Sequence, residues 1–261
     1  MDELNGLFRD RIGISKDEVL TFASLDHVLE KTSRAIPFEN LCVVGNRTKE
    51  ITKENLANKI IKHHEGGLCY ELNALFYLFL VENGFQAALV RGVTFDQVGQ
   101  RWSTTGKTHV TNLITHDGQP YLVDTGFGGN LPLKPVLLNG NIVTSDNGEF
   151  RVERVDSEHG DHVLYMKLRH KDTDWKLGYM FDSTQVVHNL SELNEIQNII
   201  LEHPASPFNK RPLVTRMTER GNMILTDTSF TEWVDGQVER KEIDSQTFQQ
   251  IAKGRFGISY P

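Results

Sequence analysis

The residue best suited to chemistry is Cys69, which follows two glycines and precedes a strongly helical pattern. Its surroundings read Glu65-Gly-Gly-Leu-Cys-Tyr-Glu-Leu-Asn73. A thiol at a helix N-terminus feels the positive end of the helix dipole, and the free N–H groups there favour a thiolate and can stabilise an oxyanion. A lone cysteine is more often a small buried apolar residue. The two glycines permit close approach of a substrate, so the pattern favours a nucleophilic thiol.

A thiolate nucleophile works with a base that accepts its proton and a third group that orients the base. His109 opens an apolar, strand-like run, and Asp124 ends another. The turn signal Asp117-Gly118 lies between the two runs, so a hairpin would place His109 and Asp124 on neighbouring strands. The sequence therefore predicts a triad in the order Cys, His, Asp.

Each of these residues also has a purely structural interpretation. The chain holds 10 histidines, and His63 and His64 lie closer to the thiol along the chain than His109 does. These two belong to a helix-like stretch, where exposed histidines at a helix end are favoured by the dipole. Asp124 could simply cap the strand end before Thr125 and Gly126.

Composition limits the kinds of function open to the chain. The 261 residues are 38% hydrophobic and carry 28 Lys and Arg against 35 Asp and Glu, for a net charge of −7. We expect no nucleic-acid partner and no membrane partner, because no strong basic run is present. The N-terminus does not read as a secretory signal, and no apolar stretch approaches the roughly 20 residues that span a bilayer. A cytoplasmic enzyme is expected.

Two cysteines, Cys42 and Cys69, are too few for a disulfide scaffold and suit a reducing compartment. They form no CxxC pair, so they do not make a structural zinc site unaided, and no metal is expected. Cys42 lies between apolar neighbours and is predicted to be a core residue.

The elements that must position the triad fall into three regions, which together predict an α+β fold. Residues 1–84 carry helical periodicity and predict a helical bundle, with helices at residues 24–34, 52–63 and 73–82. Residues 85–190 predict an antiparallel β-barrel, with β-branched runs at residues 86–94, 109–115 and 121–124. Residues 191–261 predict a small α/β lid, with helices at residues 190–203, capped by Ser191, and 244–255, and strands near residues 213–217, 223–226 and 230–233.

Four motifs, in order, resemble the arylamine N-acetyltransferase family. The string GGLCYELN at residues 66–73 resembles its signature of two glycines, a variable residue, the nucleophilic cysteine, an aromatic residue and Glu-Leu-Asn. Residues 36–41, IPFENL, resemble its N-terminal motif, Thr108-His109 its histidine strand, and residues 123–128, VDTGFG, the loop that carries its aspartate. The C-terminal half matches only in length and texture.

The resemblance implies a helical bundle, a β-barrel and an α/β lid, with a cysteine-protease-like arrangement of Cys69, His109 and Asp124 as the triad. It implies a role in xenobiotic metabolism. It further implies a pocket for the acceptor amine and a cofactor region beside the thioester. For the acceptor pocket the candidates are Phe38, Phe127, Gly128 and Phe208. For CoA they are Thr104, Gly106 and Thr108, with Lys210 and Arg211 suited to the phosphates.

One position departs from the family pattern. The family usually carries arginine just before the two glycines, and this chain has Glu65. A carboxylate there would raise the pKa of the nucleophilic thiol or rearrange a network of ion pairs. Glu39 and Asn40 are expected to be structural, and Glu71 and Asn73 to support the thiol.

Two short motifs suggest nucleotide binding and are not favoured. Residues 126–129 lack the third glycine and the following helix of a dinucleotide fingerprint. Residues 104–108, TTGKT, end like a phosphate-binding loop, but Arg101 occupies the position of its first glycine, and a strand-like run follows where a helix is required.

The expected reaction is acetyl transfer from acetyl-CoA through a Cys69 thioester to a small aromatic amine, an arylhydroxylamine or a hydrazine, with ping-pong kinetics. Two alternatives stay open. The Cys, His, Asp order also suits a thiol hydrolase or transglutaminase-like enzyme that does not depend on CoA. Glu65 also leaves open a pseudoenzyme that binds CoA or a partner without turnover.

Overall fold

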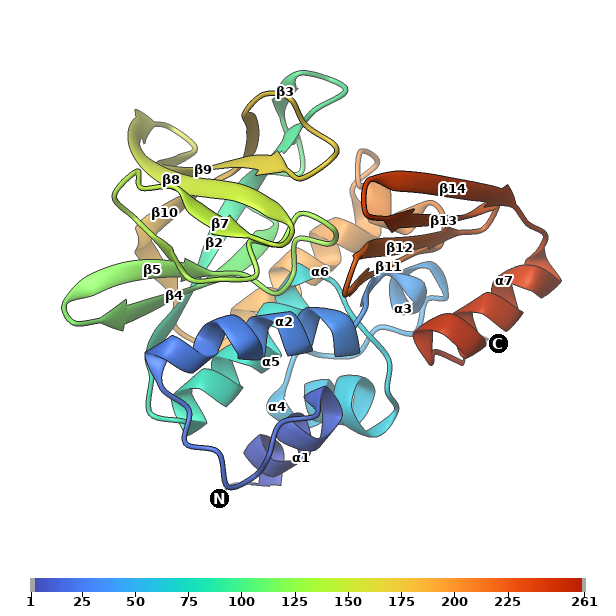
Figure 1. Ribbon diagram of the computed structural model, residues 1–261, viewed down its shortest axis with the longest axis horizontal. Helices are drawn as coiled ribbons and strands as arrows, with labels where there is room; N and C mark the ends of the chain where they lie inside the picture. The colour runs from blue at the N-terminus through green and yellow to red at the C-terminus, as the bar shows by residue number, and fades with distance from the viewer. Residues whose placement is uncertain (1–2, 260–261) are drawn as a thin grey trace.

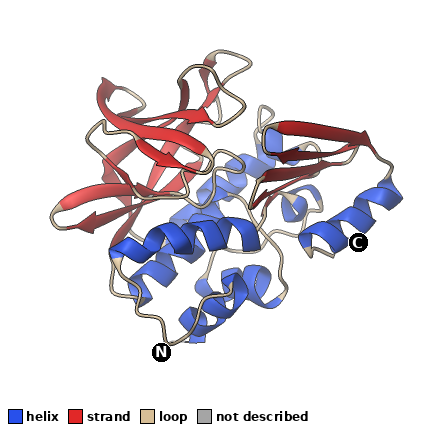
Figure 2. Cartoon of the chain, viewed as in Figure 1, coloured by secondary structure: helices blue, strands red, loops and turns tan. Residues whose placement is uncertain are grey.

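Helices make up the first third of the chain, as its apolar periodicity predicts (Figures 1 and 2). The computed structural model describes residues 3–259. Helix α2 buries Leu25, Val28 and Leu29 on one face, the spacing of an amphipathic helix. The helical elements of this region are α1 (Glu3–Ile12), η1 (Phe22–Ser24), α2 (Leu25–Ala35), α3 (Leu41–Val44), α4 (Lys53–Leu56), η2 (Ala57–Lys62) and α5 (Cys69–Glu82). Within residues 3–259, no helix is both long enough and apolar enough to cross a membrane.

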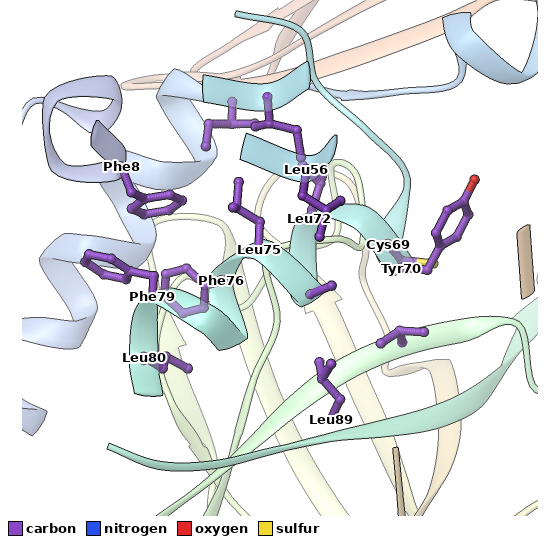
Figure 3. Close-up of a cluster of buried hydrophobic side chains, with 14 of the residues drawn as sticks. Phe8, Leu56, Cys69, Tyr70, Leu72, Leu75, Phe76, Phe79, Leu80 and Leu89 are labelled. Atoms are coloured by element: carbon purple, nitrogen blue, oxygen red, sulfur yellow. The ribbon is translucent and has the colours of Figure 1, made fainter. Parts of the chain in front are cut away.

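Helix α5 is the central helix of this region, and it begins at Cys69 itself. The Glu71 side chain accepts a hydrogen bond from the backbone N–H of Leu68, which caps the first turn. The chain leaves the helix through Gly84 at φ +84°, a conformation that favours glycine. Phe76 and Phe79 on α5 pack against Phe8 of α1 in the cluster that also contains Cys69 (Figure 3). Close packing on nearly all sides fixes the helix that carries the thiol.

The predicted helix over residues 52–63 has two parts. Its first turn is α4, and residues Ala57–Lys62 continue as the π-helical turn η2. The N–H of His63 donates to the carbonyl of Asn58, five residues earlier, at 2.9 Å. The wider turn buries both Ile60 and Ile61.

The middle of the chain forms a nine-stranded antiparallel sheet that curls into a nearly closed barrel (Figure 1). Its order is β6-β5-β4-β2-β10-β9-β8-β7, and β3 pairs with β2. The predicted hairpin is β4–β5, which turns at Asp117 and Gly118, both at positive φ. The strands are β2 (Gln86–Asp96), β3 (Arg101–Trp102), β4 (His109–His116), β5 (Gln119–Val123), β6 (Val136–Leu137), β7 (Val143–Ser145), β8 (Gly148–Ser157), β9 (Gly160–Leu168) and β10 (Lys176–Val187).

Strands β2 and β4 are buried on both faces, and this joins the barrel to the helices. Successive side chains of a strand point to opposite faces. Leu89 of β2 and Val110 of β4 therefore pack into the helical core around α5. Val90 and Leu113, the alternate residues, fill the barrel interior. This shared wall sets the distance between α5 and the start of β4.

The last part of the chain adds a five-stranded sheet in the order β1-β11-β12-β13-β14. Its first strand, β1 (Phe38–Glu39), comes from the N-terminal region and pairs with β11. The remaining elements are η3 (Leu190–Glu192), α6 (Leu193–Glu202), η4 (Pro207–Asn209), β11 (Leu213–Thr218), β12 (Gly221–Thr226), β13 (Ser229–Val234), β14 (Gln237–Glu242), α7 (Ser245–Ile251) and η5 (Ala252–Phe256). Leu193, Ile196 and Ile200 of α6 join the helical core.

The cap predicted at Ser191 is wrong. Asn189 precedes η3, and its side-chain oxygen accepts a hydrogen bond from the N–H of Ser191 at 2.9 Å. Asparagine is among the residues favoured at that position. The division into domains at residues 1–84, 85–190 and 191–261 stays a prediction.

Candidate active site

The structure brings Cys69, His109 and Asp124 together. Cys69 is the first residue of α5, His109 the first of β4, and Asp124 follows the last residue of β5. The Nε2 atom of His109 lies 2.8 Å from Oδ2 of Asp124, and the Cys69 thiol is near enough to the same imidazole to raise its pKa. Because Nε2 faces the carboxylate, Nδ1 is the ring nitrogen left for the thiol. The three side chains form the arrangement that a thiol nucleophile requires.

Four groups hold the Asp124 carboxylate in place. Oδ2 accepts from the hydroxyl of Tyr179 at 2.8 Å as well as facing His109. Oδ1 accepts from the side chain of Asn73 at 2.9 Å and from the backbone N–H of Gly126 at 2.7 Å. A buried carboxylate with this many donors stays ionised and fixed in orientation.

Asn73 is the hub that ties α5 to both strands of the hairpin. Its amide donates to the carbonyl of Val110 at 2.8 Å as well as to Asp124. Its Oδ1 accepts from the side chain of Asn112, and from both the N–H and the hydroxyl of Thr125. The side chain is fully buried. One residue, one helical turn after the thiol, therefore fixes the thiol relative to the carboxylate.

The charges of the site favour a protonated His109. Burial lowers the pKa of the imidazole, but the Asp124 carboxylate, its hydrogen bond and the contact with Cys69 together raise that pKa to about 10. Burial likewise raises the pKa of Asp124, and the charge of His109 with hydrogen bonds from His109, Asn73 and Gly126 brings it below its usual value. The pair is thus an imidazolium held by a carboxylate.

The raised pKa of His109 predicts a stability that depends on pH. Folding raises this pKa from 6.5, the ordinary value, to about 10. Its contribution to the free energy of unfolding is complete below about pH 6.5 and is lost as pH rises toward 10. We expect the difference in this free energy between wild type and His109→Gln, measured by urea denaturation, to shrink over that range. A difference that stays constant would mean that the native imidazole is neutral throughout.

An apolar cavity of about 180 Å³ opens onto the thiol and the imidazole. Three phenylalanines from distant parts of the chain line it: Phe38 of β1, Phe127 after β5, and Phe208 of η4. The rings of Phe38 and Phe208 meet edge to face at 5.6 Å, and Phe127 packs 5.2 Å from the His109 ring. The space suits a flat, apolar molecule.

The other predicted binding residues lie at different depths around this cavity. Thr108 lines it, and its carbonyl accepts from the Cys69 thiol at 3.5 Å. Thr104 and Gly106 are exposed beside two cavity-lining residues, Ser103 and Thr105. Gly128, at φ +59°, sits against the ring of Phe38, which a Cβ at that glycine would approach to 3.7 Å.

Lys210 and Arg211 follow Phe208 and are both exposed. The side chain of Arg211 lies 3.9 Å from Asp227, while its carbonyl and that of Phe208 accept hydrogen bonds from Asn40. Asn40 thereby fixes the segment that carries Phe208, which confirms its predicted structural role.

Two glycines are required by close backbone approach. A Cβ at Gly126 would lie 2.6 Å from Cα of Cys69 and 2.7 Å from the amide nitrogen of Asn73. A Cβ at Gly66 would overlap the carbonyl oxygen of Pro37. These glycines let the loop after β5 and the segment before Phe38 pack directly onto the start of α5.

Some residues of the site are not evident from the sequence. Tyr179 on β10 is 55 residues from Asp124, and no local pattern marks it as a partner. Glu65, the departure noted above, accepts a hydrogen bond from the thiol of Cys42 at 3.3 Å. Burial, opposed by Lys59 and reinforced by neighbouring carboxylates, raises the pKa of Cys42 to about 12. Cys42 is buried, as predicted.

Within residues 3–259, no cluster of three or more His, Cys, Asp or Glu side chains is placed to hold a metal ion.

A thiol at a helix start, with an imidazole and a carboxylate on adjoining strands, defines the cysteine-protease-like class of Cys-His-Asp proteins. A family model described as N-acetyltransferase matches residues 21–261. The chain belongs to the arylamine N-acetyltransferase family.

Individual relatives are similar to this protein in sequence or in structure over almost the whole chain. An uncharacterized acetyltransferase of Bacillus subtilis is 36% identical over 94% of each chain. The crystal structure of an arylamine N-acetyltransferase from Bacillus cereus, described as having a unique Cys-His-Glu catalytic triad, superposes with a TM-score of 0.94 at 34% identity, covering 99% of this chain and 100% of that one. An arylamine N-acetyltransferase of Mycobacterium marinum in complex with CoA superposes with a TM-score of 0.83 at 25% identity, covering 98% and 93%.

Proposed function

We propose that this chain transfers an acetyl group from acetyl-CoA to an arylamine, an arylhydroxylamine or a hydrazine, with Cys69, His109 and Asp124 as its catalytic residues. The observation that carries the proposal is the thiol–imidazole–carboxylate triad at the mouth of an aromatic cavity. Membership of the family and the CoA complex of the Mycobacterium marinum relative support the choice of donor.

The first half-reaction exchanges one thioester for another. The Cys69 thiolate attacks the acetyl carbonyl carbon, the bond from that carbon to the CoA sulfur breaks, and the leaving thiolate takes the proton of His109. Free N–H groups at the start of α5 suit the developing oxyanion. In the second half-reaction the amine nitrogen attacks the carbonyl carbon of acetyl-Cys69, His109 removes the amine proton, and the bond from that carbon to the Cys69 sulfur breaks. This releases the amide and regenerates the Cys69 thiolate beside a protonated His109.

The acceptor would enter the cavity as a neutral molecule. Aromatic amines are weakly basic, so no carboxylate is needed to hold a cation. Phe38, Phe127 and Phe208 offer ring contacts, which stabilise a bound aromatic group beyond simple burial. We assign Gly128, which packs against the ring of Phe38, to the same wall of the acceptor cavity.

The donor would extend outward over the polar rim. Thr104, Gly106 and Thr108 lie on the segment that reaches the thiol, so we assign them to the pantetheine end of CoA. Lys210 and Arg211 follow Phe208 and are solvent-exposed, so we assign them to its phosphates. The two unpaired cysteines suit a reducing compartment, and we propose the cytoplasm as the place of reaction.

Mixing the protein with acetyl-CoA in the absence of an acceptor tests the proposal. We expect intact mass spectrometry to show one added acetyl group on the wild type and none on Cys69→Ala. Cys42→Ala is the matched control and should still take one acetyl group, because the raised pKa of Cys42 keeps it a thiol at pH 7.

Adding 4-methoxyaniline should then remove the acetyl group and produce the amide. Rapid loss of the group to water instead would favour a thiol hydrolase. Wild-type protein that binds CoA yet takes no acetyl group would favour a pseudoenzyme, and the proposal would be abandoned.

A further inference from the structure

A lysine ammonium lies within a cluster of carboxylates behind the start of α5. The Lys59 side chain is only 15% exposed, and its Nζ donates to Oε1 of Glu71 at 2.6 Å. The same Nζ lies 3.7 Å from Oε1 of Glu39. The side chains of Glu71 and Glu39 are 9% and 1% exposed, so both ion pairs are shielded from solvent. Removing one partner of such a buried ion pair is strongly destabilising, because it leaves the other charge buried and uncompensated.

The two carboxylates each hold a segment that matters to the proposed reaction. Oε2 of Glu71 accepts from the N–H of Leu68, the residue directly before Cys69. Oε2 of Glu39 accepts from the N–H of Leu41, and Glu39 directly follows the cavity residue Phe38. Lys59 therefore joins the nucleophile's helix to the strand that carries an aromatic wall of the cavity.

Close backbone contact forces these two carboxylates toward each other. The N–H of Glu39 donates to the carbonyl of Gly67 at 3.0 Å, and Phe38 forms a parallel bridge with Gly67. Burial raises the pKa of Glu39, the charge of Lys59 opposes the increase, and the charge of Glu71 adds to it. Without a cation between them, two like charges would push these segments apart.

The π-helical turn η2 is what carries the ammonium to this place. Its widened turn buries Ile60 and Ile61, which follow Lys59, and the carbonyl of Lys59 accepts from the N–H of Glu65 at 3.1 Å. Single π turns inside helices occur often at functional sites. Glu65 itself, at the position where the family usually has arginine, contacts Cys42. In this chain the cation between Glu39 and Glu71 is the ammonium of Lys59, which lies on η2.

We propose that Lys59 is a positioning residue for acetyl transfer: its ammonium, bound by Glu71 and Glu39, sets the start of α5 and the Phe38 strand relative to each other. The inference rests on the function proposed above. Lys59 touches no substrate in this account. It acts through the placement of Cys69, which determines the rate of acetylation, and of Phe38, which determines the KM for the amine.

The test compares four variants in two assays run well below their melting temperatures. The first assay is single-turnover acetylation by acetyl-CoA, followed by intact mass, and the second is steady-state turnover of 4-methoxyaniline. Lys59→Met removes the charge, Lys59→Arg keeps it, and Glu71→Gln keeps the acceptor for Leu68 without the charge. Lys62→Met is the matched control, because Lys62 lies in the same turn and is exposed. Rates are divided by the native fraction measured by circular dichroism.

We expect Lys59→Met to lower the acetylation rate constant of the native fraction by about 10- to 100-fold, since misplacing reacting groups by about 1 Å costs about 100-fold. The KM for the amine should rise in the same variant. Lys59→Arg should recover most of the rate, because the guanidinium can bridge both carboxylates and an adjoining cavity of about 270 Å³ gives it room. Glu71→Gln should show an intermediate loss, and Lys62→Met should match the wild type.

A Lys59→Met protein whose native fraction is acetylated at the wild-type rate, with only a lower melting temperature, would reduce Lys59 to a stabilising role and overturn the inference. If Lys59→Met does not fold, Glu71→Gln decides: acetylation at the wild-type rate overturns the inference, and a slower rate supports it. These outcomes leave the proposed function standing. Wild-type protein that takes no acetyl group would overturn the proposed function, and this inference with it.

Discussion

Replacing Asp124 with asparagine is expected to slow acetylation of Cys69 by about 10,000-fold, the size of effect seen when a triad carboxylate is made neutral. The amide is nearly the same size, so the cavity and hairpin should persist. It no longer stabilises the imidazolium, because the charge that raises the pKa of His109 is gone. The measurement is single-turnover acetylation by acetyl-CoA. Asp156→Asn, at an exposed position on β8, is the control and should react like the wild type.

Asp124→Glu separates charge from geometry at the same position. The Bacillus cereus relative is described as having a Cys-His-Glu triad, so a glutamate is compatible with this fold. Here, however, the carboxylate is held by Tyr179, Asn73 and Gly126, and a longer side chain must displace some of these contacts. We expect a loss of about 100-fold, smaller than for asparagine. For the first variant, Asp124→Asn, acetylation at a rate near that of the wild type would contradict the prediction, because it would show that the carboxylate does not orient His109.

Removing the hub at Asn73 should have the largest effect on stability. Asn73→Ala leaves the buried N–H of Thr125 without a partner and removes one of the four groups that hold the Asp124 carboxylate. An unsatisfied buried polar group costs about 1–3 kcal/mol, and the other hydrogen bonds of the Asn73 side chain are lost as well. We expect the free energy of unfolding, measured by urea denaturation, to fall by about 4 kcal/mol.

Asn141→Ala, at an exposed loop position, is the matched substitution and should change the free energy of unfolding by less than about 0.5 kcal/mol. An Asn73→Ala protein as stable as this control would mean that water replaces the hub. Its native fraction should also be acetylated slowly, since Asn73 sets the distance from α5 to Asp124.

Local signals in the sequence predicted the frame of the site well. The Asp117-Gly118 turn lies between two β-branched runs, and it forms the hairpin that aligns His109 with Asp124. The family motifs predicted the α+β class, which the structure and its relatives confirm. Helix α5 begins at Cys69, as the placement of the thiol required.

The remaining features depend on contacts between distant segments, which leave no local pattern. Tyr179 reaches Asp124 only because β10 lies beside β2 in the barrel. Strand β14 has the sequence QVERKE, whose six residues are all exposed, so it lacks the apolar alternation that identifies a strand. Lys59 looks like any surface lysine until the π turn and the two glutamates are seen together.

The two-residue strand β1 also bears on when the cavity beside Cys69 forms during folding. Phe38 pairs with Thr215, and the Asn40 side chain accepts from the N–H of Leu213, 173 residues further along the chain. Contacts this distant form late and slow the folding of a domain. During synthesis, Cys69 leaves the ribosome before His109 and Asp124, and Phe208 emerges much later still. The nascent chain therefore carries Cys69 before the imidazole and the carboxylate that lie beside it in the folded protein, and the aromatic cavity is completed only after Phe208 and Leu213 have been made.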